Sequence, residues 1–228
     1  MKIGVFGGSF NPVHLGHLAA ASEVAFKTGL SQVHFVVAGR HPLKDDGSLL
    51  DAGHRFRMVE LALESNPDFT ASRVEVDRPG PCYTIDTMRT FREMYGGDVH
   101  FILGQDAMED VGSWNSALAL LKTVNFIVVS RPGYDSSALM DVLQGVASVK
   151  YKNLKFIELG RSVDGTLETI GVEGAPSTIR IVRITPLDIS SSDIRRRMAS
   201  GRPIKYLVPE AVERYLRSEG LYNQDKPG

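Results

Sequence analysis

The strongest constraint on the fold is an alternation of short apolar runs with longer amphipathic segments up to about Ser130. The apolar runs are too short for helices and rich in β-branched residues, and they cover residues 3–6, 33–37, 99–103 and 126–129. Segments with a helical spacing of apolar residues surround them at residues 12–28, 54–63, 85–95 and 114–121. This order is typical of successive β-α units. We therefore predict an α/β fold with a parallel sheet flanked by helices.

The periodic pattern weakens beyond Arg131. Residues 160–177 are rich in Gly, Ser and Thr, a composition typical of loops, and we predict an irregular insertion over about residues 136–177. An alternating strand is predicted over residues 179–184, and a helical C-terminal part over about residues 190–222, with a closing helix at residues 208–216. A chain of 228 residues fits one domain, and we expect a single domain over residues 1–228.

Charge and composition exclude several classes of protein. The formal net charge is −1, so no general basic field would attract nucleic acid or an anionic membrane, and we expect neither as a partner. No run approaches the roughly 20 apolar residues that cross a bilayer, and the apolar start ends at Gly7, short of a signal-peptide core. Cys82 is the only cysteine. We expect a cytoplasmic protein, and a homo-oligomer is compatible with the sequence.

A glycine pair ends the first predicted strand. Gly7 and Gly8 lack a Cβ, so the backbone can turn sharply and approach a ligand closely. Asn11 followed by Pro12 fits a helix N-cap with proline at the first helical position. The helix would then start at the carboxyl end of a parallel strand, where open α/β sheets bind ligands.

Two histidines follow with helical spacing. His14 and His17 are three residues apart and share one face of the expected helix, close to its N-terminus. Free backbone N–H groups, the helix dipole and two imidazoles favour an anion there, and Gly16 keeps that face open at a cost of about 1 kcal/mol in helix propensity. Alternatively His14 is a loop residue and His17 a core residue, but the glycines, cap and proline converge on the same helix start. A Walker A loop and a G-x-G-x-x-G fingerprint are both absent.

A second anion site is predicted after the late strand. Ser190 and Ser191 can cap a helix and donate hydroxyl hydrogen bonds, and Arg195 follows one turn later. The alternative is an ordinary capped surface helix with solvated arginines. Arg196 and Arg197 are interpreted as surface charges.

These two segments resemble the signatures of the nucleotidyltransferase superfamily. The first reads Gly-Gly-Ser-Phe-Asn-Pro-Val-His-Leu-Gly-His, and the second reads Ile-Ser-Ser-Ser-Asp-Ile-Arg, with Ser192 in place of threonine. The resemblance implies a Rossmann-like nucleotidyltransferase fold and an ATP site, in which Asp106 after Gly104 would bind a ribose. The implied ATP-binding residues are Gly7, Gly8, Ser9, Phe10, His14, His17, Gly104, Asp106, Ser190, Ser191 and Arg195. The implied catalytic residues are His14, His17, Lys44 and Arg195.

A third segment resembles one family within this superfamily. Gly-Pro-Cys-Tyr-Thr-Ile-Asp-Thr at residues 80–87 is similar to Gly-Pro-Ser-Tyr-Thr-x-x-Thr of bacterial nicotinate mononucleotide adenylyltransferases, with Cys82 as the departure. The resemblance implies that Tyr83 and Thr84 hold the nicotinate group, that Trp114 stacks on its ring and that Lys44 neutralises substrate phosphate. A helix cap at Thr84 and core packing of Trp114 remain alternatives. His41 receives no role.

The resemblance implies a reaction without a covalent enzyme intermediate. The phosphate of nicotinate mononucleotide would attack the α-phosphorus of ATP, giving nicotinate adenine dinucleotide and pyrophosphate in NAD biosynthesis. No cluster of metal ligands stands out, so we assign no metal residues and expect Mg²⁺ to be carried by ATP. Alternative acceptors are nicotinamide mononucleotide and phosphopantetheine. A non-catalytic nucleotide-binding sensor is an alternative of another class, and an NAD-dependent oxidoreductase is disfavoured by the missing fingerprint.

Overall fold

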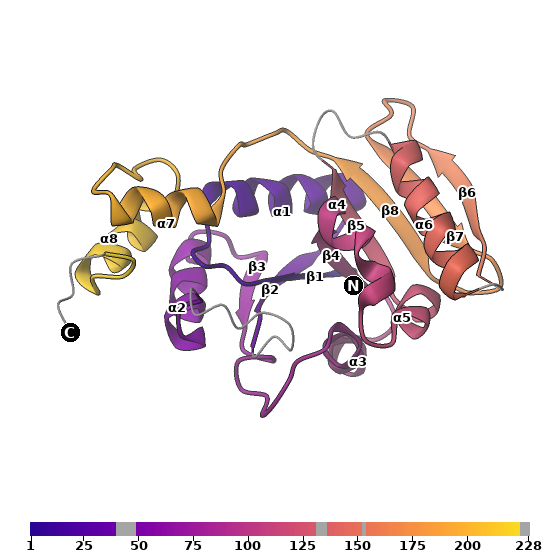
Figure 1. Cartoon of the computed structure of the whole chain (residues 1–228), viewed down its shortest axis with the longest axis horizontal. Coiled ribbons are helices and arrows are strands. Elements are labelled where there is room, and N and C mark those ends of the chain that lie inside the picture. The colour runs from indigo at the N-terminus through magenta and orange to yellow at the C-terminus, as the bar shows by residue number, and fades with distance from the viewer. Residues whose placement is uncertain (40–48, 131–135, 152–153, 224–228) are drawn as a thin grey trace.

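The computed structural model describes residues 1–39, 49–130, 136–151 and 154–223 (Figure 1). Within these residues, eight strands form one sheet in the order β3-β2-β1-β4-β5-β8-β7-β6. The strands are β1 (Ile3–Gly8), β2 (Gln32–Val37), β3 (Phe69–Ser72), β4 (Val99–Gly104), β5 (Asn125–Ser130), β6 (Phe156–Arg161), β7 (Leu167–Val172) and β8 (Thr178–Arg183). The first six strands in this order, from β3 to β8, pair in parallel with their neighbours. At the other edge, β7 pairs antiparallel with β8, and β6 pairs antiparallel with β7.

Helices cover both faces of the sheet. They are α1 (Leu15–Thr28), α2 (Ala52–Leu63), α3 (Thr84–Tyr95), α4 (Gln105–Glu109), α5 (Ala117–Thr123), α6 (Ser136–Lys150), α7 (Ser191–Ala199) and α8 (Glu210–Ser218), together with the short 3₁₀ helix η1 (Val111–Ser113). One apolar core joins the sheet to α3, α4, α5 and α6, and the other joins it to α1, α2, α7 and α8. Helix α8 packs against α2, and α7 and α8 lie at the opposite end of the molecule from β6 and β7 (Figure 1).

The alternation of side chains in β2 explains why the central strands read as continuous apolar runs. Val33, Phe35 and Val37 point into the core that contains α1, while Val36 points into the core that contains α3. Successive strand residues face opposite sides of a sheet, so a strand covered on both faces must be apolar at nearly every position. The predicted α/β fold with a parallel sheet is confirmed.

The predicted start of the first helix is wrong. We expected Asn11 as N-cap and Pro12 as the first helical residue, but α1 begins at Leu15 with His14 as N-cap in an extended conformation. Tertiary hydrogen bonds hold residues 9–12 as a loop instead. Two smaller boundaries also differ, because α3 begins at Thr84 with Tyr83 as N-cap, and α5 begins at Ala117, three residues beyond Trp114.

The prediction of an irregular insertion over about residues 136–177 is also wrong. This part of the chain contains α6, β6 and β7. Strand β6 lies at the sheet edge, where all of its residues after Phe156 are exposed, and its ladder is irregular between Glu158 and Gly160. An exposed, bulged edge strand has little need for alternating apolar residues, so its sequence lacks the usual period. The C-terminal part from about residue 190 to 222 contains α7 and α8.

None of the helices in the described parts of the chain is long and apolar enough to cross a lipid bilayer.

Candidate nucleotide site

A cavity of about 440 Å³ opens at the carboxyl ends of β1 and β4. Its walls come from the end of β1, the first turns of α1, the junction of β4 with α4, and the segment from Ile184 to Ser191 that leads into α7. Nine residues predicted to bind ATP line it, namely Gly7, Gly8, Phe10, His14, His17, Gly104, Asp106, Ser190 and Ser191. Segments far apart in the sequence therefore meet at one site of a size usual for small-molecule ligands.

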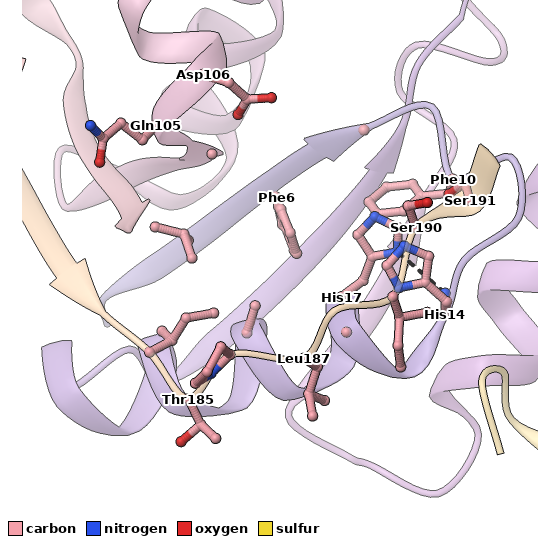
Figure 2. A pocket seen from close by; sticks show the side chains of 18 of the residues that line it. Phe6, Phe10, His14, His17, Gln105, Asp106, Thr185, Leu187, Ser190 and Ser191 are labelled. Atoms are coloured by element: carbon pink, nitrogen blue, oxygen red, sulfur yellow. Dashed lines mark hydrogen bonds between the residues drawn. The ribbon is translucent and has the colours of Figure 1, made fainter. Parts of the chain in front are cut away.

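The two histidines at the start of α1 are in direct contact. The rings of His14 and His17 stack with centroids 3.7 Å apart (Figure 2). The backbone N–H of His14 donates to Nδ1 of His17 at 3.2 Å. Because Nδ1 accepts this hydrogen bond, a neutral His17 carries its ring proton on Nε2. His17 therefore combines a helix-capping contact with a ring donor at the wall of the cavity.

Aromatic rings and missing Cβ atoms shape this wall. Phe10 packs edge-on against His17 with centroids 5.1 Å apart. A Cβ on Gly8 would lie 2.9 Å from the Phe10 ring, and a Cβ on Gly16 would lie 3.0 Å from Nδ1 of His14. At both positions the nearness of a ring, rather than the backbone conformation, favours glycine.

The N-terminus of α7 faces the same cavity. Ser190 caps this helix by accepting a hydrogen bond from the backbone N–H of Asp193 at 3.1 Å. The hydroxyl of Ser191 donates to the carbonyl of Pro12 at 2.8 Å, so the second helix is fastened to the loop before the first. The predicted serine cap is confirmed.

Arg195 takes part in the same attachment. Its Nη1 donates to the carbonyl of Asn11 at 2.8 Å and its Nη2 donates to the hydroxyl of Ser192 at 3.3 Å. Arg195 is absent from the cavity wall, as is Ser9. In this structure the guanidinium of Arg195 therefore contacts the β1–α1 connection and its own helix rather than the cavity.

Asp106 lies at the other end of the cavity from the histidines (Figure 2). It is a residue in the first turn of α4, with Gly104 as N-cap. A Cβ on Gly104 would lie 2.5 Å from Oδ1 of Asp106, so the carboxylate occupies space that a side chain at position 104 would take. The buried side chain of Gln105 also lines the wall, and no sequence motif pointed to it.

The segment from Ile184 to Ile189 forms a further wall that the motifs did not reveal. Ile184, Thr185, Pro186, Leu187 and Ile189 all line the cavity. The carboxylate of Glu23 in α1 holds this segment, because it accepts from the backbone N–H of Thr185 at 2.9 Å. A strand-to-helix connection without a catalytic residue type offers no signal in the sequence.

Tyr83, Thr84 and Trp114, which are predicted to bind the acceptor, do not line this cavity. Tyr83 and Thr84 are partly exposed at the N-terminus of α3. Glu75 links this turn to the end of β2, since its carboxylate accepts from the hydroxyl of Thr87 at 2.6 Å and from the backbone N–H of Gly39 at 3.4 Å. Glu75 is a second residue that could not be recognised from a sequence motif.

Trp114 lies on the α3 side of the sheet, against the core formed with α3 to α6. Its ring packs edge-on against Phe101, with centroids 6.3 Å apart. A Cβ on Gly7 would lie 2.9 Å from the same Phe101 ring. Phe101 is thus a neighbour of both Trp114 and Gly7. Part of the Trp114 side chain packs on the core, as the core-packing alternative expects.

Lys44 and His41 lie outside the described residues. Within the described parts, no group of three or more His, Cys, Asp or Glu residues could hold a metal ion. The donors at the histidine end of the cavity are imidazoles and hydroxyls, which suit phosphate oxygens better than a hard cation.

Arg55 supports the site from behind. Its side chain in α2 is only 2% exposed. Nη1 donates to the carbonyl of Ser9 at 2.9 Å and Nε donates to the carbonyl of Leu50 at 2.8 Å. Burial lowers the pKa of Arg55, although a guanidinium remains charged at neutral pH. A positive charge therefore lies beneath the loop that leads to the histidines.

A parallel sheet with two helix N-termini at one cavity beyond its carboxyl edge defines an α/β nucleotide-binding protein. The family model described as cytidylyltransferase-like matches residues 5–197. The chain therefore belongs to the cytidylyltransferase-like family.

Curated relatives match almost the whole chain. A probable nicotinate-nucleotide adenylyltransferase of Thermoanaerobacter sp. (strain X514) is 38% identical, covering 99% of this chain and 96% of the relative. Proteins of the same name from Moorella thermoacetica and from Thermus thermophilus are 39% and 38% identical, each over 97% of this chain and over 91% and 100% of their own lengths.

Solved structures share the fold at low sequence identity. A nicotinic acid mononucleotide adenylyltransferase of Plasmodium falciparum in complex with NaAD has a TM-score of 0.69 at 18% identity, covering 97% of each chain. The same Plasmodium enzyme complexed with APC has a TM-score of 0.68, also at 18% identity, covering 97% of this chain and 96% of that one. Together with the observed sheet, these likenesses confirm the predicted Rossmann-like nucleotidyltransferase fold.

Proposed function

We propose that this protein transfers the adenylyl group of ATP to the phosphate of nicotinate mononucleotide, giving nicotinate adenine dinucleotide and pyrophosphate. The observation that carries the proposal is the meeting of two helix N-termini at one cavity, with the stacked His14 and His17 at one and Ser190 and Ser191 at the other. Both helix N-termini favour negative charge. The names of the curated relatives support nicotinate mononucleotide as the acceptor.

The cavity suggests how ATP would lie. Its triphosphate would take the end with His14, His17, Ser190 and Ser191, where imidazole, hydroxyl and backbone donors are available. The ribose would lie near Asp106, whose carboxylate can accept hydrogen bonds from two hydroxyls. The adenine ring would lie against the apolar segment from Ile184 to Ile189. Arg195 would add a charge-assisted contact to the phosphates through N–H groups other than the one that donates to the carbonyl of Asn11.

The acceptor would approach from the α3 side of the sheet. Tyr83 and Thr84 at the start of α3 would hold the nicotinate group, and Trp114 would stack on its ring, a contact worth about 0.5–1.5 kcal/mol beyond area burial. Lys44 would neutralise the acceptor phosphate. The two substrates would then meet beside Gly7 and Gly8, at the carboxyl end of β1.

The reaction requires the protein to align the two substrates and to stabilise charge, and it does not require a general base. An oxygen of the acceptor phosphate forms a bond to the α-phosphorus as the bond to the pyrophosphate oxygen breaks in line with it. The acceptor oxygen is already anionic, so no proton must be removed. Alignment of the reactants can lower the barrier by roughly 7–11 kcal/mol in favourable cases. Donors such as His17 would stabilise the charge that develops on the leaving pyrophosphate.

Mg²⁺ would enter as part of the MgATP substrate. The histidine end of the cavity contributes nitrogen and hydroxyl donors, and Asp106 is the carboxylate on its wall. Mg²⁺ prefers oxygen ligands and usually binds through substrate phosphates in nucleotide sites. We assign no protein ligands to it.

The proposal is tested by offering purified protein MgATP with one acceptor at a time and measuring pyrophosphate release and the dinucleotide product. The acceptors are nicotinate mononucleotide, nicotinamide mononucleotide and phosphopantetheine. We expect the highest kcat/KM for nicotinate mononucleotide. Faster release with another acceptor would reassign the substrate, and the absence of release with all three would refute adenylyl transfer.

A further inference from the structure

The C-terminal segment reaches back to the loop between β1 and α1, which we call the β1–α1 loop (residues 9–14). The hydroxyl of Tyr222 donates to Oδ1 of Asn11 at 2.6 Å, across 211 positions of sequence. Asn11 is only 3% exposed. Burial raises the pKa of the Tyr222 hydroxyl, so this group keeps its proton and remains a donor at neutral pH. The contact therefore joins the end of the described chain to the β1–α1 loop.

Asn11 is a junction of several segments. Its Oδ1 also accepts from the backbone N–H of Leu50 at 3.2 Å, just before α2. Its backbone carbonyl accepts from Nη1 of Arg195 in α7 at 2.8 Å. The position of Asn11 is thus set by contacts from three parts of the chain, of which the C-terminal segment is one.

The carbonyls on either side of Asn11 are held in the same way. Arg55 in α2 donates to the carbonyl of Ser9 at 2.9 Å, and Ser191 in α7 donates to the carbonyl of Pro12 at 2.8 Å. Each of these donors belongs to a helix outside the β1–α1 loop. Donors from distant helices therefore support the conformation of the loop.

The β1–α1 loop in turn presents two parts of the cavity wall. Phe10 packs against the ring of His17 with centroids 5.1 Å apart, and His14 stacks on His17 at 3.7 Å. A displacement of Asn11 would shift the residues on both sides of it. Tyr222 itself does not line the cavity, so any effect on the nucleotide must pass through Asn11.

We propose that Tyr222 is a positioning residue of the nucleotide site, which acts through Asn11 to hold the β1–α1 loop in the conformation that binds the triphosphate. Tyr222 lies beyond residue 197, where the match to the family model ends. The inference rests on the proposed function only in taking the cavity to be the ATP site.

The test compares two tyrosine-to-phenylalanine variants of the full chain. Tyr222→Phe removes the hydroxyl that contacts Asn11. Tyr215→Phe is the matched control, because the Tyr215 hydroxyl makes a 2.8 Å hydrogen bond to Nδ1 of His54, which lies in α2 outside the loop. Both changes delete one hydroxyl from the C-terminal part and leave an aromatic ring in place.

The first measurement is affinity for a non-hydrolysable ATP analogue by calorimetry, together with the melting temperature of each variant. The loss of one neutral hydrogen bond corresponds to about a two- to tenfold change in an equilibrium constant. We expect Tyr222→Phe to weaken analogue binding by about fivefold, whereas Tyr215→Phe binds as the wild type does. Equal affinities in all three proteins would overturn the proposal, as would a loss of affinity in Tyr215→Phe of the same size.

The second measurement separates positioning from general destabilisation. With nicotinate mononucleotide as acceptor, Tyr222→Phe should raise the KM for ATP and leave the KM for the acceptor unchanged. A parallel rise in both KM values with a lower melting temperature would mean that Tyr222 only stabilises the fold, and the proposal would fail. If the wild type binds the analogue but releases no pyrophosphate with any acceptor, the proposed function fails while the affinity comparison still decides this inference. If the wild type does not bind the analogue, both fail.

Discussion

Gly16, the second residue of α1, lies where any side chain would meet the ring of His14. A Cβ at this position would lie 3.0 Å from Nδ1 and 3.1 Å from Cε1 of His14, whereas ordinary contacts begin at 3.4 Å. His14 is only 5% exposed and stacks on His17 at 3.7 Å. In Gly16→Ala, therefore, the His14 ring must move by a few tenths of an ångström, and His17 is in direct contact with that ring.

Gly16→Ala should separate activity from stability. Replacing glycine by alanine in a helix contributes up to about 1 kcal/mol of helix propensity, so the folded state should lose little or no stability. A misplacement of 1 Å in an active site can cost about 100-fold in rate, and a shift of a few tenths should lower kcat/KM for ATP by about tenfold. That loss corresponds to about 1.4 kcal/mol of transition-state stabilisation.

Gly145→Ala provides the control for this substitution. Gly145 lies within α6 and is exposed, and in the part of the chain that the structure describes no atom outside its own helix backbone lies within 4 Å of the position of a Cβ. This variant should gain up to about 1 kcal/mol of stability with unchanged kinetics. Pyrophosphate release gives kcat/KM, and urea unfolding gives the free energy of unfolding. Wild-type kcat/KM in Gly16→Ala would refute the argument that the missing Cβ sets the place of His14.

Three further predictions concern single residues. His17→Ala should lower kcat by about 100-fold or more with an unchanged circular dichroism spectrum, and a wild-type rate would refute its phosphate role. Burial lowers the pKa of His34 and of His100, so the unfolded chain binds more protons below pH about 6.5 and stability should fall as the pH drops from there. Urea unfolding at neutral and acidic pH checks this. His34→Phe should reduce the dependence of the free energy of unfolding on pH, and an equal dependence in both proteins would show that His34 does not contribute to it. Ser190→Ala removes the acceptor for the Asp193 N–H and should cost about 1 kcal/mol, whereas an unchanged unfolding free energy would show that the cap contributes nothing.

The sequence alone predicted the class of fold and the two segments whose helix N-termini meet at the cavity. The central strands are buried on both faces, so a continuous apolar run marks each of them. Glycines, serines and histidines near a helix start act on backbone within a few residues, and such local chemistry can be read directly from the chain. The acceptor was predicted by resemblance, because no local rule links Tyr83 or Trp114 to a nicotinate ring.

The tertiary structure decided what depends on distant partners. The arrangement of residues 9–12 as a loop ahead of α1 is supported by hydrogen bonds from Arg55, Arg195 and Tyr222, which are 46, 184 and 211 positions from the residues they contact. A helix-capping rule considers only neighbouring residues and so placed the cap at Asn11 instead. The edge strand β6 escaped prediction because exposure on both sides removes the period on which strand prediction depends. Local sequence encodes burial and capping, whereas the conformation of the β1–α1 loop is set by donors that only the folded chain brings to it.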